Sequence, residues 1–231
     1  RFILAELNTH RQLSRNSSSS RAIPIKKMLS QIEDNMAIPV YWGKAKSGMQ
    51  ADGEVDEDDV WWYREKWEFA YDEVSYRVKQ LSDLVEGKEG FMKALHKQIP
   101  NRLIEPFQMM KTVITGTDWD NFFNLRLHPD ADPNICMLAY KMYKAMEQSK
   151  PNLLYSEEYH TPYVKSLRDS TGSLFYFDVD DNYLTLSDAI KLSAASCASV
   201  SYRTEGMTLE KAEKIFDMLI KAEVVHSSPF E

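Results

Sequence analysis

Apolar residues that recur at helical spacing constrain the fold of this chain most, because they mark several separate segments. The longest segment predicts a helix from Asp59 to about Val85, and a shorter one predicts a helix over residues 25–32. Further helices are expected over residues 118–127, 134–148, 187–202 and 208–225, with one interrupted or begun at Pro100 that ends near Pro106. The apolar face expected on the longest helix consists of Val60, Trp61, Trp67, Ala70, Tyr71, Val74, Val78 and Leu81.

Two short segments have the composition of strands. Residues 109–117 are rich in β-branched side chains and end at a glycine, and residues 172–181 hold an aromatic run. Internal repeats are absent from the sequence, as are the glycine patterns of dinucleotide-binding and P-loop folds. Many helices with few strands predict an α+β fold, a helix-rich mixed α/β domain over residues 1–231.

The charge of the chain limits its partners. The 231 residues are 43% apolar and carry a net charge of −7, so we expect neither nucleic acid nor an anionic membrane as a partner. No apolar run approaches the length of a membrane span. Cys136 and Cys197 lie in apolar helical patterns, which favours buried free thiols and a cytoplasmic location. We also expect the natural N-terminus to precede Arg1, which opens inside an apolar segment.

Residues 9–24 contain four consecutive serines, which are typical of a flexible linker. The same stretch also holds a dense set of anion ligands, namely His10, Arg11, Arg15, Asn16 and Arg21. Serine hydroxyls, main-chain N–H groups and guanidinium groups together describe a phosphate site, and Pro24 can open a helix directly after them. A phosphate-binding loop and a solvated surface loop both remain open at this point.

Conventional nucleophilic catalysis finds little support in the sequence. No G-x-S-x-G motif is present, and neither cysteine has a neighbouring histidine. The histidines at positions 10, 96, 128, 160 and 226 lack metal-ligand spacing, so no metal site is expected. Arginine instead stands beside amide and hydroxyl groups in three stretches, "HRQLSRNSSSSR", "KQIPNRLIEP" and "WDNFFNLR". Such settings favour a planar, polyanionic ligand such as a nucleotide.

These three stretches together resemble the flavin-dependent thymidylate synthases. The signature of that family is a His-Arg pair followed, after seven intervening residues, by a serine and then an arginine. The first stretch matches it with His10, Arg11, Ser19 and Arg21. The second matches the family's "NRLLEP"-like element through Asn101, Arg102, Leu103, Glu105 and Pro106, and the third matches its "W-x-N-F-F-x-L-R" helix through Trp119, Asn121, Phe122, Phe123, Leu125 and Arg126.

Two further blocks resemble the family but in an unusual order. "CASVSYRTEG" (197–206) and "HSSPFE" (226–231) are similar to elements that precede the His-Arg signature in most members, whereas here they follow it. The chain therefore resembles a circularly permuted member. Permutation is tolerated when the chain ends lie close in space, so we expect Arg1 and Glu231 to be neighbours.

The resemblance implies roles for individual residues. Arg126 and Ser19 would be catalytic, with Arg126 facing the uracil ring of deoxyuridylate (dUMP) and stabilising the negative charge that develops there. The implied dUMP contacts are Ser19, Ser20, Arg21, Arg102 and Arg126. The implied FAD contacts are His10, Arg11, Ser19, Asn121 and Ser201.

The reaction implied by the resemblance is the reductive methylation of dUMP to thymidylate. NADPH would reduce FAD, methylenetetrahydrofolate would supply the carbon, and the flavin would pass a hydride to the nucleotide without an enzyme nucleophile. The partners implied are these small nucleotide and folate substrates and further copies of the chain, since the family forms homotetramers whose sites are shared between subunits.

Two alternatives remain open. Departures from the family pattern at Ser17, Ala22 and Asp132 are compatible with a related enzyme that hydroxymethylates dUMP. The chain could instead be a nucleotide-binding module without catalysis, which loss of flavin binding would distinguish.

Overall fold

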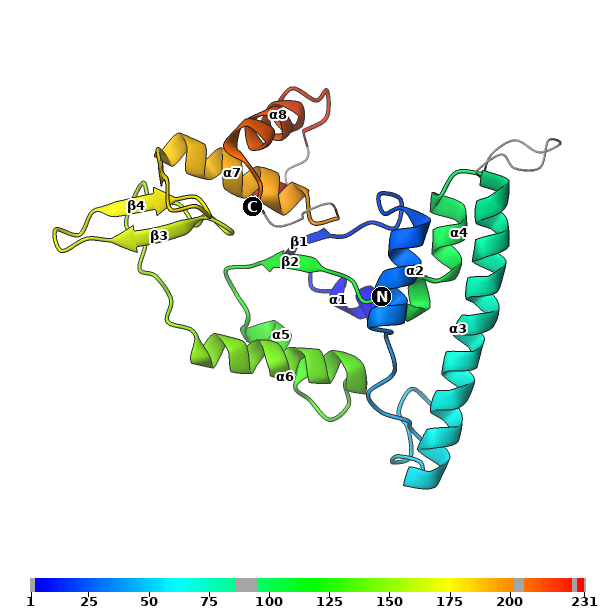
Figure 1. The fold of residues 1–231 in the computed structure, drawn as a ribbon. Coiled ribbons are helices and arrows are strands. Elements are labelled where there is room, and N and C mark those ends of the chain that lie inside the picture. The colour runs from blue at the N-terminus through cyan, green and yellow to red at the C-terminus, as the bar shows by residue number, and fades with distance from the viewer. Residues whose placement is uncertain (1–2, 86–94, 202–205, 226–227, 231) are drawn as a thin grey trace. The chain divides into compact units, whose positions relative to one another are not determined.

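The computed structural model describes residues 3–85, 95–201, 206–225 and 228–230 (Figure 1). Within these ranges the chain forms eight α-helices, two short 3₁₀ helices and five strands in two small antiparallel sheets. This mixture agrees with the expected α+β class. The contacts divide the chain into unit 1 (Arg1–Gln12, Ser19–Met110 and Thr117–Lys150) and unit 2 (Leu13–Ser18, Lys111–Gly116 and Pro151–Glu231). That they form one domain stays a prediction.

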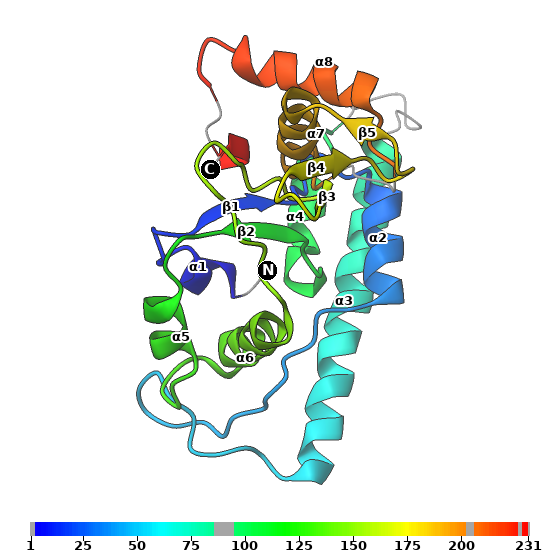
Figure 2. The same ribbon diagram turned by 90° about the vertical axis from the view of Figure 1, so that its left-hand side faces the viewer.

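The first core of unit 1 is built from helices α2 (Ile25–Asp34), α3 (Glu57–Val85) and α4 (Gln98–Leu103) and the 3₁₀ helix η1 (Glu105–Phe107). Helices α2 and α4 lie beside α3 in both views (Figures 1 and 2). The buried side chains are Ile23, Ile25, Met28, Leu29, Ile32, Tyr71, Val78, Ile104 and Phe107. The helices predicted from apolar spacing over residues 25–32 and 59–85 are therefore confirmed.

The apolar face predicted for α3 is only partly correct. Tyr71 and Val78 are buried, whereas Trp61 keeps 67% of its surface exposed and Ala70 is exposed as well. At 1.5 Å per residue α3 is about 43 Å long and the ten-residue α2 only about 15 Å, so α2 covers only part of α3. The apolar spacing predicts which face of α3 is buried, but it does not predict how much of the length of α3 a neighbouring helix covers.

The rest of unit 1 contains helices α1 (Leu4–Leu7), α5 (Asp120–Arg126) and α6 (Pro133–Gln148). Asp132 caps α6 by accepting from the main-chain N–H groups of Asn134 and Ile135 at 2.9 and 3.2 Å. The helix expected over residues 118–127 begins two residues later, at Asp120. Its N-cap is Trp119, and the Asp118 carboxylate accepts from the N–H of Asp120 at 3.1 Å.

Unit 2 contains a two-stranded sheet that the sequence only half predicted. Strand β2 (Thr112–Thr115) was expected, but it pairs with β1 (Ser14–Ser17), which lies inside the serine stretch that reads as a loop. The hydroxyls of Ser17 and Thr112 lie 3.0 Å apart across this pair. The first half of the serine stretch is thus neither a linker nor a free loop.

The remainder of unit 2 packs a second sheet on helices. Strands β3 (Lys165–Arg168), β4 (Leu174–Phe177) and β5 (Tyr183–Leu184) form an antiparallel meander, of which only β4 was predicted. Helices α7 (Leu186–Ala198) and α8 (Leu209–Ile220) pack on one another, and the 3₁₀ helix η2 (Ser228–Phe230) contacts α7 and β1. The core consists of Tyr176, Leu184, Ala189, Leu192, Ala195 and Ala212.

Three further expectations concern the cysteines, the membrane and the chain ends. Cys197 is buried and free, as expected, but Cys136 is free and only half-buried, so its predicted burial is wrong. In the part of the chain that the structure describes, no helix is long and apolar enough to cross a membrane. The expected proximity of Arg1 and Glu231 concerns residues outside the described ranges.

Candidate functional site

Side chains of the second and third motif stretches bind back to the first stretch within unit 1. The first of these junctions is centred on Asn101 of α4, which is fully buried. Its Nδ2 donates to the main-chain oxygens of Ser20 and Ile23 at 2.7 and 2.9 Å. The buried hydroxyl of Ser20 donates in turn to the carboxylate of Glu105 in η1. The second half of the serine stretch is therefore anchored to α4 and η1.

Two exposed arginines adjoin this junction. Arg21 directly follows Ser20 and Arg102 directly follows Asn101, so the hydrogen bond between Ser20 and Asn101 brings their backbones together. Ser19 is half-buried, and its hydroxyl accepts from the N–H of Arg21 at 3.3 Å. Guanidinium groups beside a serine turn are suitable donors for a phosphate. Ser20 itself uses its proton on Glu105, so its expected contact with dUMP would have to be made in another way.

The second junction is centred on Arg126, at the C-terminal end of α5. Its Nε donates to Nε2 of His10 at 2.8 Å, and its Nη1 donates to the carboxylate of Glu6 at 3.1 Å. Its Nη2 donates to the main-chain oxygen of Glu6 at 3.3 Å and to the hydroxyl of Thr9 at 3.0 Å. The Thr9 hydroxyl donates to the same Glu6 oxygen at 2.7 Å. One guanidinium thus organises the whole turn that precedes His10.

His10 serves this junction from a buried position. Its ring packs edge-on against Phe122 of α5, with ring centroids 4.9 Å apart. Because Nε2 accepts the hydrogen bond of a guanidinium, which is always charged, Nε2 carries no proton. The imidazole is therefore neutral in this arrangement, and within this chain it acts on Arg126.

A pocket of about 1170 Å³ lies at this second junction and is lined entirely by unit 1. Arg126 and Glu6 both contribute to its wall. The other lining residues include Tyr41, Met49, Leu127, Asp130, Asp132 and Tyr140. Ligand pockets usually measure about 300–1,000 Å³, and this pocket exceeds that range because it is broadly open to solvent. The pocket combines aromatic and apolar walls with a single guanidinium and several carboxylates.

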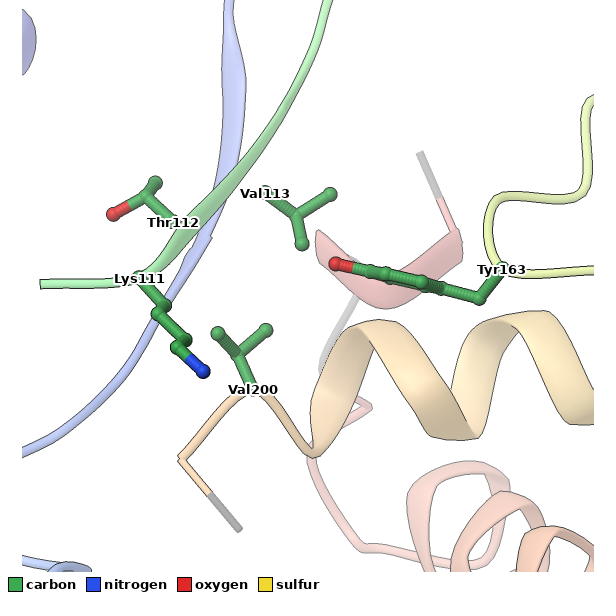
Figure 3. A pocket seen from close by; sticks show the side chains of 5 residues that line it. All are labelled: Lys111, Thr112, Val113, Tyr163 and Val200. Atoms are coloured by element: carbon green, nitrogen blue, oxygen red, sulfur yellow. The ribbon is translucent and has the colours of Figure 1, made fainter. Parts of the chain in front are cut away.

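A second, much smaller pocket of about 60 Å³ lies in unit 2 (Figure 3). Its lining residues are Lys111, Thr112, Val113, Tyr163 and Val200. The Tyr163 hydroxyl points toward Val113 of β2 in this view. Its volume accommodates a few water molecules and is far below that of a nucleotide pocket.

The remaining predicted site residues are less closely connected. Arg11 and Asn121 have exposed side chains in unit 1, whereas Ser201 is half-buried in unit 2. The stretch 197–206 lies partly outside the described residues, and so does the stretch 226–231. The predicted set is thus divided between the two units. Within unit 1, His10 bonds to Arg126, and Ser20 and Arg21 adjoin Asn101 and Arg102.

Sequence reasoning missed two partners of Arg126, because neither Glu6 nor Thr9 was predicted as a site residue. Glu6, Thr9 and His10 stand at positions i, i+3 and i+4, the spacing that places side chains on one face of a helical turn. That spacing could have indicated that the three residues share one partner.

Comparison with protein-family models, with curated proteins and with solved structures finds no match for this chain. Among the described residues, no group of three or more histidine, cysteine, aspartate or glutamate side chains is arranged to hold a metal ion. The motif stretches and the two junctions that connect them are therefore the features that bear on function.

Proposed function

We propose that this chain is a flavin-dependent thymidylate synthase that converts dUMP to thymidylate with methylenetetrahydrofolate, FAD and NADPH. One observation carries the proposal. The three stretches that resemble the family are connected within unit 1, the second to the first through Asn101 and the third to the first through Arg126. These hydrogen bonds join residues 81 and 116 positions apart, so stretches that are distant in the sequence are neighbours within unit 1, as parts of one site would be.

The side chains of unit 1 provide a suitable donor set for the flavin cofactor. Arg11 and Asn121 are exposed, so they can donate to the FAD diphosphate without leaving a packed core. His10 would contribute through the arginine that it supports, because its own ring is buried. Ser201, the other position that the resemblance assigns to FAD, lies in unit 2. When bound, FAD supplies the hydride; the protein supplies positioning and charge.

The substrate would be held by the other arginines. Arg21 and Arg102, beside the Asn101 junction, provide two charged forks for the phosphate of dUMP, with Ser19 as a further polar contact. Arg126 has five N–H protons, of which four are used in the bonds to Glu6, Thr9 and His10. Nη1, with one proton unused and the other bonded to the partly exposed Glu6 carboxylate, is the donor that could reach a uracil oxygen. Charge developing on that oxygen would be stabilised by a group that is already in position.

The decisive experiment is mass spectrometry of the nucleotide after anaerobic incubation of the protein with FAD, NADPH, methylenetetrahydrofolate and dUMP. Thymidylate is the expected product. Hydroxymethyl-dUMP would instead identify the related hydroxymethylase, and unchanged dUMP from folded, flavin-free protein would favour a binding module. A tetrameric mass in solution is expected as well, since the family shares its sites between subunits.

Matched variants connect the product to the proposed site. Arg102→Ala should raise the KM for dUMP at least tenfold, because one phosphate fork is lost. Arg64→Ala removes an exposed arginine on α3 whose ion pair is with Glu68 four residues away, so it controls for loss of charge. Equal KM values for the two variants would contradict the assignment of Arg102 to the substrate.

A further inference from the structure

The acceptors around Arg126 differ in how firmly they are held. One is a main-chain oxygen of α1, one is the ring nitrogen of the buried His10, and one is the Thr9 hydroxyl, which itself bonds to that main-chain oxygen. The fourth is the carboxylate of Glu6. The first three are fixed by the fold of the turn, whereas the carboxylate ends a side chain with several rotatable bonds.

The Glu6 carboxylate also differs from the other three acceptors in its exposure to solvent. The Glu6 side chain is 39% exposed, compared with 17% for Arg126. An ion pair that reaches solvent contributes little to stability, because water replaces the lost partner. Glu6 can therefore release Arg126 without disturbing the turn, and Arg126 keeps three bonds when it does.

The position of Glu6 in the pocket wall gives its release a consequence for ligand binding. Glu6 and Arg126 both line the 1170 Å³ pocket, so the bond between them faces the space that a ligand would enter. While the bond is intact, the positive charge of Arg126 is compensated and one of its two Nη1 protons is occupied. Asp130 and Asp132 line the same pocket and add further negative charge. An anionic ligand therefore meets an acidic pocket until Glu6 moves.

We propose that Glu6 is an internal acceptor that occupies on Arg126 the place of a ligand oxygen, so that an oxygen-bearing anion binds in this pocket by displacing the Glu6 carboxylate. Identifying that anion as dUMP rests on the proposed function. Glu6 then sets the affinity of the site, because it lowers the binding of every competitor that is too weak to displace it.

The binding test uses the full chain and isothermal titration with dUMP. Glu6→Gln keeps the size of the side chain and removes its charge, so dUMP should bind about tenfold more tightly than to the unaltered protein, and Glu6→Ala should do at least as much. The matched control is Asp130→Asn. It removes one negative charge from the same pocket, but Asp130 faces His128 at 3.6 Å and is not a partner of Arg126.

The outcomes separate this inference from the proposed function. A gain in affinity for dUMP that is much larger in the Glu6 variants than in Asp130→Asn supports displacement of the Glu6 carboxylate. Equal affinities in Glu6→Gln and Asp130→Asn overturn it, while binding of dUMP by the unaltered protein leaves the proposed function standing. Failure of the unaltered protein to bind dUMP contradicts the proposed function, and the displacement is then decided without a nucleotide.

A second measurement needs no nucleotide. It uses phenylglyoxal, which modifies accessible guanidinium groups, and the rate of modification at Arg126 is followed by peptide mass spectrometry. The Glu6 variants should react about tenfold faster at Arg126 than the unaltered protein and Asp130→Asn. Circular dichroism verifies that each variant is folded. Equal rates at Arg126 in all folded proteins would overturn the inference, whatever the ligand is.

Discussion

The Nε of Arg126 donates a hydrogen bond to Nε2 of His10 at 2.8 Å, although the two residues are 116 positions apart. This bond connects the end of α5 to the turn that follows α1. Phe122, one turn earlier on α5, packs against the same imidazole. The two contacts fix the orientation of the histidine ring and of the guanidinium together, so a change at either residue alters the other.

Replacing Arg126 should therefore affect both stability and turnover. In Arg126→Ala the buried Nε2 of His10 loses its donor, which should lower the free energy of unfolding by about 1–3 kcal/mol. Arg126→Lys should recover little of this, because an ammonium cannot donate to His10, Thr9 and Glu6 in one plane. On the proposed function, thymidylate formation should be lost in both variants.

Urea unfolding followed by circular dichroism measures the first effect, with Arg64→Ala as the control. That exposed pair with Glu68 should change the free energy of unfolding by no more than about 1 kcal/mol. An Arg126→Ala protein as stable as Arg64→Ala would show that the hydrogen bond to His10 contributes nothing.

The sequence predicted the long helices well and the strands poorly. Helices α2 and α3 follow from apolar spacing because most of their burial is on one face, which the chain specifies locally. Strand β1 has no such signal: its four residues are Ser14, Arg15, Asn16 and Ser17, and it is a strand because β2 pairs with it from 95 residues away. Pairing between distant segments is not recorded in the composition of either one alone.

The candidate site was predicted in its residue types but not in its connections. The motif stretches named His10, Asn101 and Arg126, yet nothing in them states that Asn101 is fully buried or that Arg126 is held by Glu6. Burial depends on which elements cover a residue, and this is decided by the packing of α4 against the serine stretch. Ser20, expected to be a substrate contact, is for the same reason a partner of Glu105.

Asn101 should tolerate no acidic replacement. Its Nδ2 donates to two main-chain oxygens from a fully buried position, so Asn101→Asp would face both oxygens with a carboxylate. We expect the free energy of unfolding to fall by about 3–5 kcal/mol, the usual cost of an uncompensated buried charge. Asn101→Ala should cost less, about 1–3 kcal/mol, since only the donor is lost.

The matched control is the same exchange at an exposed asparagine. Asn121→Asp on α5 should remain within about 0.5 kcal/mol of the unaltered protein in urea unfolding. If Asn101→Asp unfolds at the same urea concentration as Asn121→Asp, the junction between α4 and the serine stretch does not hold the fold.

A second ion pair, between Glu158 and Arg168, predicts a loss of stability at low pH. Arg168 of β3 binds both carboxylate oxygens of Glu158, at 2.8 and 2.6 Å, and its hydrogen bonds lower the pKa of Glu158 from 4.5 to about 2. Because the pKa is lower in the folded state, the stabilisation is complete above pH 4.5 and is lost as the pH falls toward 2. Arg168→Gln should remove this pH dependence.

The measurement is urea unfolding of both proteins between pH 7 and pH 2. The difference in their free energies of unfolding should shrink below pH 4.5, and Glu158→Gln should show the same behaviour because it removes the other partner. Lys165→Gln is the control, since Lys165 lies on the same strand and pairs with Asp181. A difference between the unaltered protein and Arg168→Gln that stays constant down to pH 2 would rule out the pairing.

Tyr71 predicts a loss of stability at high pH. Its hydroxyl is buried and is without a hydrogen-bond partner among the described residues, and its ring packs against Phe107 at 5.5 Å. Burial, followed by the charges of Glu33 and Asp72, raises the pKa of Tyr71 from 10.0 to about 12. The unfolded chain therefore releases the proton first, and stability is lost as the pH rises from 10 toward 12.

Tyr71→Phe removes both the unpaired hydroxyl and this loss. At pH 8 the variant should be at least as stable as the unaltered protein, by up to about 1 kcal/mol, because an unsatisfied buried group disappears. Its advantage should then grow above pH 10. Urea unfolding at several pH values measures this, with Tyr76→Phe as control, since Tyr76 on the same helix is 55% exposed and accepts from Gln80. A Tyr71→Phe protein that is less stable than the unaltered protein at pH 8 would contradict this prediction. Such a loss of stability would mean that the hydroxyl has a hydrogen-bond partner, which the substitution removes.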